Sequence, residues 1–340
     1  MCSDIDFVIP WVDGSDTEWQ KLKASYSNDE SKASASNGVE RYRDWGILPY
    51  WFRAVEKYAP WVRRIHFITC GQVPEWLNLN HPKLHFVKHE DYIPREWLPV
   101  FSANPIELNI FRIEGLSEKF VYFNDDMFLN AAVKPEDFFR KGLPCAVFMP
   151  SFGYLRWGMD GIVNIIVNNL IVINKNFKFI PNFIKNFTKW VSFRYGVRYA
   201  VKNFLLFMLL LPFKTFTGFR EYHTVNSFLK STFIEVWEKE HDLLAKTSSH
   251  KFRARSDVNQ WLMEKWQLAS GKFYPGRPSS ASYSEERDIA DCVKDIKTGR
   301  HKIICINDNE ALNAELFGEF SRRVREAYSE VFPEKSAFEL

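Results

Sequence analysis

Short apolar runs alternate with longer amphipathic segments along this chain. We expect buried strands in five runs that are rich in β-branched and aromatic residues: 6–11, 64–70, 84–88, 119–123 and 302–306. Segments 45–62 and 105–115 have the periodicity of helices, and the second begins with Pro105 and ends with Gly115. Strands that alternate with helices favour an α/β fold, here a Rossmann-like, mostly parallel sheet with helices on both faces.

Polar residues follow every predicted strand. The five clusters are Val12-Asp13-Gly14-Ser15-Asp16, Gly71-Gln72, His89-Glu90-Asp91, Asn124-Asp125-Asp126 and Asn307-Asp308-Asn309. Each cluster alone is explained by the preference of Asp, Asn and Gly for turns. In open α/β sheets, however, ligands bind at the carboxyl ends of the strands, so five such clusters together favour a binding site.

Two of these clusters suit a nucleotide bound through a metal ion. The adjacent carboxylates of Asp125 and Asp126, beside Asn124, are hard oxygen ligands for Mg²⁺ or Mn²⁺, which bridge nucleotide phosphates. In the first cluster, Trp11 offers an aromatic face to a base, and Gly14 permits close approach of the backbone. The alternative for the first cluster is an ordinary turn between a strand and a helix.

Later in the chain, one histidine and two arginines are candidates for acid–base chemistry and phosphate binding. His223 precedes a helix predicted to begin near Val225, and a neutral imidazole there suits a general base. Arg253 and Arg255 precede another predicted helix, where guanidinium groups hold phosphate through two hydrogen bonds. The alternatives are a structural histidine and a solvated basic turn.

Residues 151–220 have a different composition from the rest. They combine apolar and aromatic residues with Lys and Arg, and almost no acidic residue lies between Asp160 and Arg220. The ten-residue run 204–213 is too short to span a bilayer. Its basic flanks suit a helix that lies in a membrane interface, so segment 162–213 is a candidate membrane contact. A buried core helix is an equally good interpretation.

Composition excludes some classes of function. A formal net charge of +3, without a basic arm, argues against a nucleic-acid partner. The five cysteines are odd in number and lack metal-ligand spacing, which indicates free thiols in a reducing compartment. The sequence begins without a signal-peptide pattern, so we expect a cytoplasmic protein.

Four stretches resemble the conserved regions of the Stealth family of hexose-1-phosphate transferases, in the family's order. They are Ile5–Asp16 (IDFVIPWVDGSD), Arg41–Leu129, the pair EYHTVNSF and FRARSDVNQWL, and Cys305–Asn309 (CINDN). The family includes bacterial capsular-polysaccharide phosphotransferases and the animal lysosomal-enzyme N-acetylglucosamine-1-phosphotransferase. This chain has no lysosomal-type inserted modules and no membrane anchors at its ends, so it is more similar to the bacterial members.

The resemblance implies phosphoryl transfer. The donor is expected to be a UDP-sugar such as UDP-N-acetylglucosamine, and an acceptor hydroxyl attacks the β-phosphorus. Sugar-1-phosphate is transferred, UMP leaves, and the anomeric bond stays intact. The expected acceptor is a capsular or cell-surface glycan, lipid-linked and reached at the inner face of the cell membrane. Such a reaction mainly requires in-line positioning and compensation of negative charge.

The resemblance also implies roles for particular residues. Asp125 and Asp126, with Asp308, would hold Mg²⁺ or Mn²⁺, and His223 would take the acceptor proton. Arg253, with Arg112, would hold the diphosphate, and Arg255 is a substitute because the alignment there needs an adjustment by one residue. Further positions that match the family are Asp13, Asp16, Arg53, Gly71, Gln72, Glu107, Asn124 and Asp257. With Trp11, Val12 and Gly14, all of these except Glu107 and Asp257 are expected to bind the donor.

We therefore expect a catalytic core formed by residues 1–150 and 221–310, with a helical insertion at 151–220. A C-terminal helix at 311–332 lies within the last segment, 311–340. Two other functions compete with this interpretation. One is a metal-dependent glycosyltransferase, which would release UDP in place of UMP. The other is a non-catalytic, membrane-peripheral glycan-binding protein.

Overall fold

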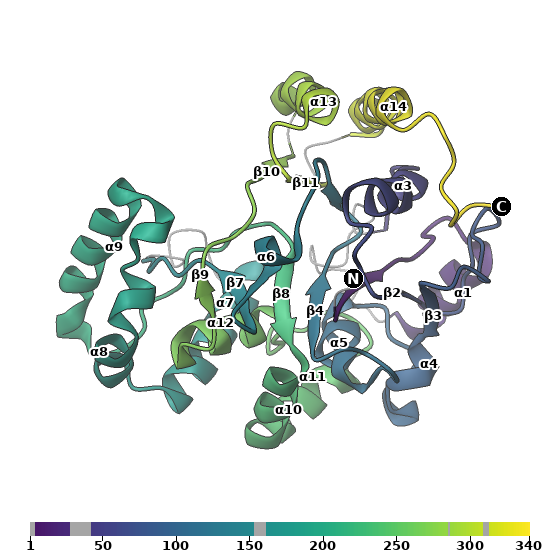
Figure 1. Ribbon diagram of the computed structural model, residues 1–340. Helices are drawn as coiled ribbons and strands as arrows, with labels where there is room; N and C mark the ends of the chain where they lie inside the picture. The colour runs from purple at the N-terminus through teal and green to yellow at the C-terminus, as the bar shows by residue number, and fades with distance from the viewer. Residues whose placement is uncertain (1–3, 28–41, 153–160, 285, 309–312) are drawn as a thin grey trace.

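A five-stranded sheet in the order β3-β2-β1-β4-β8 forms the centre of the fold (Figure 1). The computed structural model describes residues 4–27, 42–152, 161–284, 286–308 and 313–340. The strands are β1 (Ile5–Pro10), β2 (Ile65–Thr69), β3 (Leu84–Lys88), β4 (Lys119–Tyr122) and β8 (Asn226–Leu229). The first four run parallel, and β8 runs antiparallel to β4. The mostly parallel α/β sheet expected from the sequence is confirmed.

Helices cover both faces of this sheet, because successive strand residues point to opposite sides. Ile5, Phe7 and Ile9 of β1 pack in one core with helical residues, and Val8 packs in the other. The first core includes residues of α3 (Leu48–Tyr58), α13 (Ile289–Thr298) and α14 (Ala314–Val331). The second includes residues of α5 (Ala103–Leu108), α10 (Lys230–Lys239), α11 (His241–Ser249) and α12 (Trp261–Ser270).

Two small sheets extend the core. One has the order β10-β11-β5, and the other β6-β7-β9. Their strands are β5 (Met127–Leu129), β6 (Phe139–Arg140), β7 (Leu143–Ala146), β9 (Tyr274–Pro275), β10 (Ser280–Tyr283) and β11 (Ile303–Ile306). The chain passes from β4 to β5 through Asn124, Asp125 and Asp126, so this acidic turn joins the main sheet to a smaller one. The amide of Ile306 donates to the Asp126 carbonyl at 2.8 Å, which ties β11 to the same turn.

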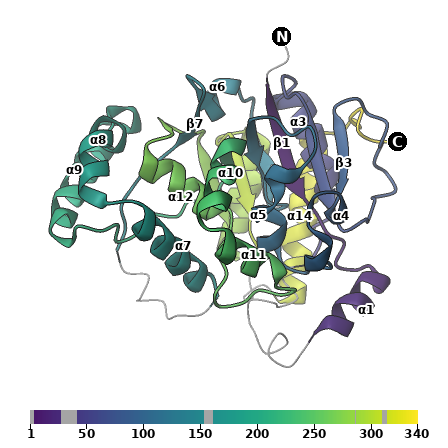
Figure 2. The same cartoon turned by 90° about the horizontal axis from the view of Figure 1, so that it is seen from below.

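The insertion is helical. It contains α7 (Ile162–Asn176), α8 (Phe179–Trp190), η6 (Phe193–Tyr195), α9 (Val197–Leu210) and η7 (Leu211–Phe213). α7 packs against α12, and α8 and α9 form one end of the molecule, opposite α1 (Thr17–Tyr26) (Figure 2). The two ends of the insertion meet as a bridge between Pro150 and Phe219, supported by a bond from the Arg220 amide to the Met149 carbonyl at 2.8 Å.

The predicted bounds of two helices were wrong. The helix expected at 105–115 ends at Leu108 and continues as a 3-10 turn, η4 (Ile110–Arg112), because Asn109 turns its side chain back to the Pro105 carbonyl at 2.8 Å. The helix expected near Val225 begins only at Lys230, since the apolar residues before it form β8 at the edge of the sheet. The first half of the chain also contains the short helices α4 (His89–Tyr92) and α6 (Pro135–Phe138) and the 3-10 turn η3 (Arg95–Trp97). A further 3-10 turn, η8 (Glu286–Asp288), precedes α13.

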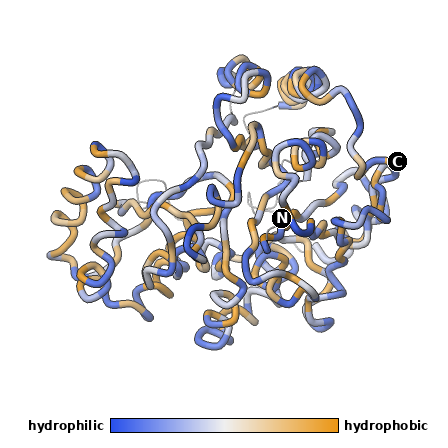
Figure 3. The backbone as a smooth tube through the Cα atoms, viewed as in Figure 1, coloured by the Kyte–Doolittle hydropathy of each residue, from blue (hydrophilic) through white to orange (hydrophobic). Residues whose placement is uncertain are grey.

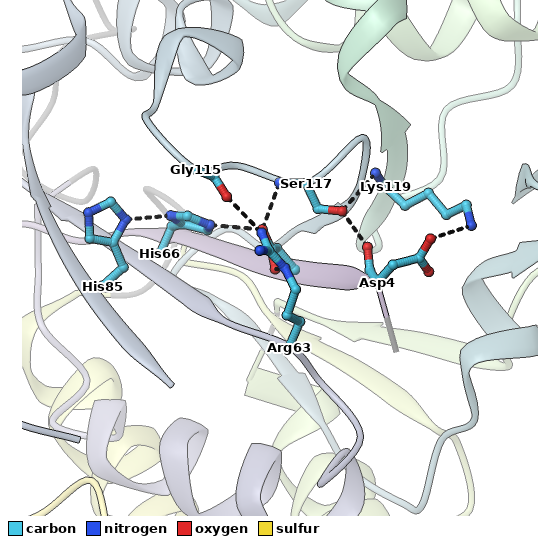
Figure 4. A network of polar contacts seen from close by, with 8 residues as sticks. Asp4, Arg63, His66, His85, Gly115, Ser117 and Lys119 are labelled. Atoms are coloured by element: carbon cyan, nitrogen blue, oxygen red, sulfur yellow. Dashed lines mark hydrogen bonds and ion pairs between the residues drawn. The ribbon is translucent and has the colours of Figure 1, made fainter. Parts of the chain in front are cut away.

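A buried carboxylate organises the β1–β2 pair. Asp6 of β1 is fully buried, and its oxygens accept bonds from Arg63 at 2.5 and 2.8 Å and from the Ser117 amide at 2.8 Å. The ring of His66 lies 3.0 Å from the same carboxylate and 2.9 Å from His85 (Figure 4). Burial alone would raise the pKa of Asp6, but the bonds from His66 and Arg63 outweigh it and hold the pKa below its usual value.

Replacing this carboxylate should destabilise the fold. Asp6→Ala leaves a guanidinium, an imidazole and a backbone amide without their acceptor, so we expect a loss of about 3 kcal/mol in the free energy of unfolding. Asp4→Ala is the control, because Asp4 is mostly exposed and bonds Lys119 at 2.8 Å; it should cost less than about 1 kcal/mol. Equal urea midpoints for the two variants would contradict this account.

Candidate active site

One cavity of about 250 Å³ collects the ends of five strands. β1 contributes Trp11 and Val12, β2 contributes Cys70, and β3 contributes His89. Asn124, Asp125 and Asp126 follow β4, and Asn307 and Asp308 follow β11. His223 and Arg253 also line the cavity. The ends of these strands therefore meet at one cavity, although β11 belongs to a different sheet and Asp13, Gly71 and Gln72 of the predicted clusters lie outside the lining.

The two adjacent acids differ in their surroundings. The Asp125 residue is exposed to solvent, but the protein around the cavity displaces water from its carboxyl, and this desolvation, followed by the charge of Asp126, raises its pKa to about 7. Asp126 accepts a bond from the Cys305 thiol, with sulfur and oxygen 3.1 Å apart. Its other oxygen, Oδ1, is buried and has no hydrogen-bond partner among the described residues.

His223 lies beside this carboxylate. Its Nε2 atom is 3.4 Å from Asp126 Oδ2, the oxygen that also accepts from the Cys305 thiol. The His223 side chain is partly exposed to the cavity. Asp126, His223 and Cys305 each present a possible ligand atom, and these atoms lie within 4.8 Å of one another. The site thus combines carboxylates, a base and a buried oxygen that lacks a donor.

Glu107 is a second acid at the site; it matches the family, but no role was predicted for it. Glu107 of α5 lines the cavity and accepts a bond from the Tyr122 hydroxyl at 3.1 Å, and its Oε2 has no partner within the described part of the chain. Burial raises its pKa to about 7, and the charge of Arg253 partly opposes this rise. The signal in the sequence was an acid between apolar neighbours in PIELNI.

The loop that carries Arg253 is held by a buried carboxylate. Asp257 is fully buried, accepts from the Ala254 amide at 3.0 Å and from the Asn104 side chain at 2.9 Å, and lies 2.6 Å from the His250 ring. Because these bonds close the turn on itself, Asp257 positions Arg253 at the cavity. Arg255 does not line the cavity. Its backbone carbonyl accepts a hydrogen bond from the Asn168 side chain at 2.8 Å.

Asp308 faces an arginine. Both of its oxygens accept from Arg43, at 2.5 and 2.7 Å, and Arg43 also lines the cavity. Arg43 could not be identified from the sequence, since its partner lies 265 positions away. The predicted metal-binding role of Asp308 is therefore not supported by its position.

Comparison of the sequence with known proteins identifies its relatives. Residues 3–31 match Stealth protein conserved region 1, and residues 41–145 match conserved region 2. The capsular polysaccharide phosphotransferase WcwK of Streptococcus pneumoniae is 43% identical over 338 residues, which cover 98% of both chains. The receptor polysaccharide phosphotransferase WefC of Streptococcus oralis is 41% identical and covers 99% of both. The chain belongs to the Stealth family.

The family membership confirms the expected enzyme class, a phosphotransferase. The exopolysaccharide phosphotransferase cps2G of Lactiplantibacillus plantarum is a further relative, 40% identical over 99% of this chain and 96% of its own. Among solved structures, the galactosyltransferase LgtC covers 96% of this chain and 95% of its own, with a TM-score of 0.38 and 9% identity. That likeness is too distant to bear on the reaction.

Several residues of this Stealth protein that were expected to bind the donor lie outside the cavity lining and hold the structure beside it. Gln72 donates to the Asp13 carbonyl at 3.0 Å and to the Asp16 carboxylate at 2.9 Å, and Asp16 caps α1. Gly14 lies so close to Tyr42 that an added Cβ would be 2.1 Å from the Tyr42 carbonyl oxygen. Gly71 has a φ of +115°, which favours glycine. These residues fix the turns that present Trp11, Val12 and Cys70.

Two further arginines, one predicted to hold the diphosphate and one to bind the donor, also lie elsewhere in the Stealth protein. Arg112 stacks 4.8 Å from the Trp237 ring, and its Nε donates to Asn109 at 3.0 Å. Arg53 holds the C-terminal segment, with bonds to Glu339 at 2.6 and 2.8 Å. Neither residue lines the cavity, so its position does not support a role at the diphosphate.

The raised pKa of Asp125 predicts how this residue affects stability. Its folded pKa of about 7 lies above its unfolded value of about 3.9, so its contribution is full below about pH 3.9 and is lost as pH rises through about 7. Asp125→Asn cannot ionise, and it should therefore melt at a higher temperature than wild type at about pH 8. The difference should shrink towards about pH 5.

Thermal melts in a metal chelator test this expectation. Asp242→Asn is the control, since the Asp242 side chain is fully exposed on α11. A constant difference between Asp125→Asn and wild type across this pH range would show that the Asp125 carboxyl is not protonated near neutrality.

Proposed function

We propose that this enzyme transfers hexose-1-phosphate from a UDP-sugar, such as UDP-N-acetylglucosamine, to a hydroxyl of a capsular or cell-surface glycan, releasing UMP. The observation that carries the proposal is the contact between His223 and Asp126 in a cavity that also contains Asp125 and Arg253. A base beside paired carboxylates and an arginine suits phosphoryl transfer. The relatives are phosphotransferases of capsular, receptor and exopolysaccharides, which supports this acceptor class.

His223 is the proposed general base. The acceptor oxygen forms a bond to the β-phosphorus, the bond from that phosphorus to the bridging oxygen breaks, and UMP leaves with the electron pair. The imidazole takes the acceptor proton, and the Asp126 carboxylate at 3.4 Å stabilises the imidazolium that results. The bond between the sugar and its phosphate is untouched.

Arg253 is the proposed diphosphate ligand. It is the one of the two predicted arginines at 253 and 255 that lines the cavity, and its charge acts on the buried Glu107. Because guanidinium groups bind phosphate oxygens in pairs, Arg253 would compensate charge that develops on the leaving group. Trp11 and Val12, at the end of β1, would contact the uridine.

Asp125 and Asp126 would hold Mg²⁺ or Mn²⁺ through oxygen atoms. The buried Asp126 Oδ1 lacks a donor in the described structure, and desolvation, followed by the charge of Asp126, raises the pKa of Asp125. A cation would offset both effects, so it fits the two acids. Burial raises the pKa of the Cys305 thiol, and a neutral thiol is a poor ligand for either ion. The bound cation would neutralise the diphosphate.

The released nucleotide tests the reaction. Wild-type enzyme with UDP-N-acetylglucosamine, a divalent cation and a glycan acceptor should release UMP and form a phosphodiester. His223→Gln should lower kcat about 10²–10⁴-fold, with little change in the KM for the donor, because the base acts in the transition state. His241→Gln is the matched control, because the His241 side chain is 69% exposed. Release of UDP without a phosphodiester would instead establish a glycosyltransferase.

We also propose that the outer surface of α8 and α9 binds an anionic membrane. Residues 161–220 contain no acidic residue and nine basic ones: Lys175, Lys178, Lys185, Lys189, Arg194, Arg198, Lys202, Lys214 and Arg220. Val197, Val201, Leu205 and Leu209 recur every four residues along one side of α9, and all are exposed. Figure 3 shows hydrophobic, orange stretches along this helix. None of the described helices has the length and apolar character needed to cross a bilayer. An apolar stripe with basic neighbours suits the membrane interface.

Liposome flotation tests this surface. Wild type should float with vesicles rich in phosphatidylglycerol and remain below with neutral vesicles. Leu205→Glu with Leu209→Glu should reduce the floated fraction at least about tenfold, since both side chains are 61% exposed and their loss leaves the core intact. Leu79→Glu is the control, because Leu79 is 43% exposed elsewhere. Equal flotation of all three proteins would refute the proposed membrane surface.

A further inference from the structure

A second cavity, of about 280 Å³, lies at the junction between the insertion and the catalytic core. Its walls come from three separate parts of the chain: α6 to β7, the 3-10 turn η6, and the loop after β9. Three arginines line it, Arg140, Arg194 and Arg277. Arginines from three elements that converge on one cavity make a favourable site for an anion.

Aromatic rings hold these guanidinium groups, but no acid neutralises them. Arg140 and Arg194 lie 5.7 and 5.0 Å from the ring of Tyr274, and Arg277 lies 3.8 Å from the ring of Tyr222. Arg140 also donates through Nε to a backbone carbonyl at 2.8 Å. Within the described ranges, none of the three forms an ion pair with a carboxylate. Stacking fixes each guanidinium plane while leaving N–H groups for a ligand.

The acids nearby do not cancel this charge. Asp137 at the cavity wall is paired with Lys302 at 2.7 Å, so Glu136 is the remaining lining acid against three arginines. Glu264 acts on Arg277 through space but is itself bonded to Lys265 at 2.6 Å. Burial lowers the pKa of Arg277, so its desolvated charge would gain from a bound anion. The cavity therefore keeps a net positive charge.

The position of this cavity connects it to the catalytic base. Tyr222, whose ring carries Arg277, directly precedes His223, and its hydroxyl contacts that of Tyr199 on α9. Arg194 lies between α8 and α9, the helices of the proposed membrane surface. In Figure 1, β7 and β9 lie between these helices and the main sheet. A ligand in the cavity would thus lie between the membrane surface and His223.

We infer that this cavity binds a phosphate group carried by the acceptor, and so orients the acceptor hydroxyl towards His223. The inference rests on the proposed transfer reaction, because the acceptor is defined by it. Two sources supply the same chemistry: the diphosphate that joins a glycan to its lipid carrier, and a phosphodiester within the growing glycan. Three arginines can bind either group through paired hydrogen bonds.

Binding of inorganic pyrophosphate tests the cavity without any turnover. Calorimetry should detect pyrophosphate binding to wild type and to Arg253→Gln, whose active-site arginine is removed. The triple variant Arg140→Gln, Arg194→Gln and Arg277→Gln should lose this binding at least about tenfold, because each arginine contributes charged hydrogen bonds. Arg322→Gln on the exposed side of α14 is the matched control.

The result is independent of whether the donor is a UDP-sugar. Loss of pyrophosphate binding in Arg253→Gln, with full binding in the triple variant, would overturn the inferred site. So would unchanged affinity in all variants. Retention by Arg253→Gln and loss by the triple variant support the site, even if the proposed reaction fails its own test. Thermal melts of each variant separate loss of binding from loss of folding.

Steady-state kinetics then separate the two sources of phosphate. Three acceptors are compared: a glycan on a lipid diphosphate, a glycan with an internal phosphodiester, and a phosphate-free glycan on a neutral alkyl chain. Arg277→Gln should raise KM about tenfold for a phosphate-bearing acceptor, with donor KM unchanged. An effect confined to the first acceptor identifies the lipid diphosphate, and one confined to the second identifies the phosphodiester. An equal effect on the phosphate-free acceptor would overturn the inference.

Discussion

The antiparallel pairing of β5 with β11, extended by a hydrogen bond from the Ile306 amide to the Asp126 carbonyl, joins the two halves of the site. Asp126 lies in the turn after β4 of the main sheet. Ile306 is the last residue of β11, which belongs to a smaller sheet and comes late in the chain. Because this pairing aligns the two strand ends, the turn after β11 is held against the acidic turn. The thiol of Cys305 then reaches Asp126, and Asp308 reaches Arg43. The geometry of the cavity depends on this alignment.

Carboxylates at the two ends of the parallel strands have opposite surroundings. At the amino end, Asp6 receives hydrogen bonds from Arg63 and the Ser117 amide and contacts His66, so its charge is compensated. At the carboxyl end, Asp126 keeps one buried oxygen without a donor in the described structure, and Asp125 has a raised pKa. Sites that bind ligands are commonly less stable than the framework that supports them. The charge at Asp125 and Asp126 is therefore less compensated than the charge at Asp6.

The sequence identified features that depend on local order and missed those that depend on distant contacts. The strand at 119–123 and its acidic turn are contiguous, so apolar periodicity was sufficient to find them. Arg43 was missed because its acid lies 265 positions away, and Arg53 was misassigned because its partner Glu339 lies 286 positions away. The segment after His223 was predicted as a helix, since a short apolar run does not distinguish an edge strand from a helix start. The family resemblance named the residues, but only the fold separated those that line the cavity from those that support it.

The narrow entrance of the insertion has a consequence for how such enzymes diversify. The chain leaves the core at Pro150 and returns at Phe219, and these two residues are bridged across adjacent backbone. Beyond this bridge the insertion also packs into the core, since α7 contacts α12 and residues of α7, α8 and α9 belong to the second core. Because the entropy of closing a longer segment grows slowly with its length, insertions of different length can begin and end at the same bridge. Variation of the insertion is therefore constrained less by its length than by the apolar face that it must present to the sheet.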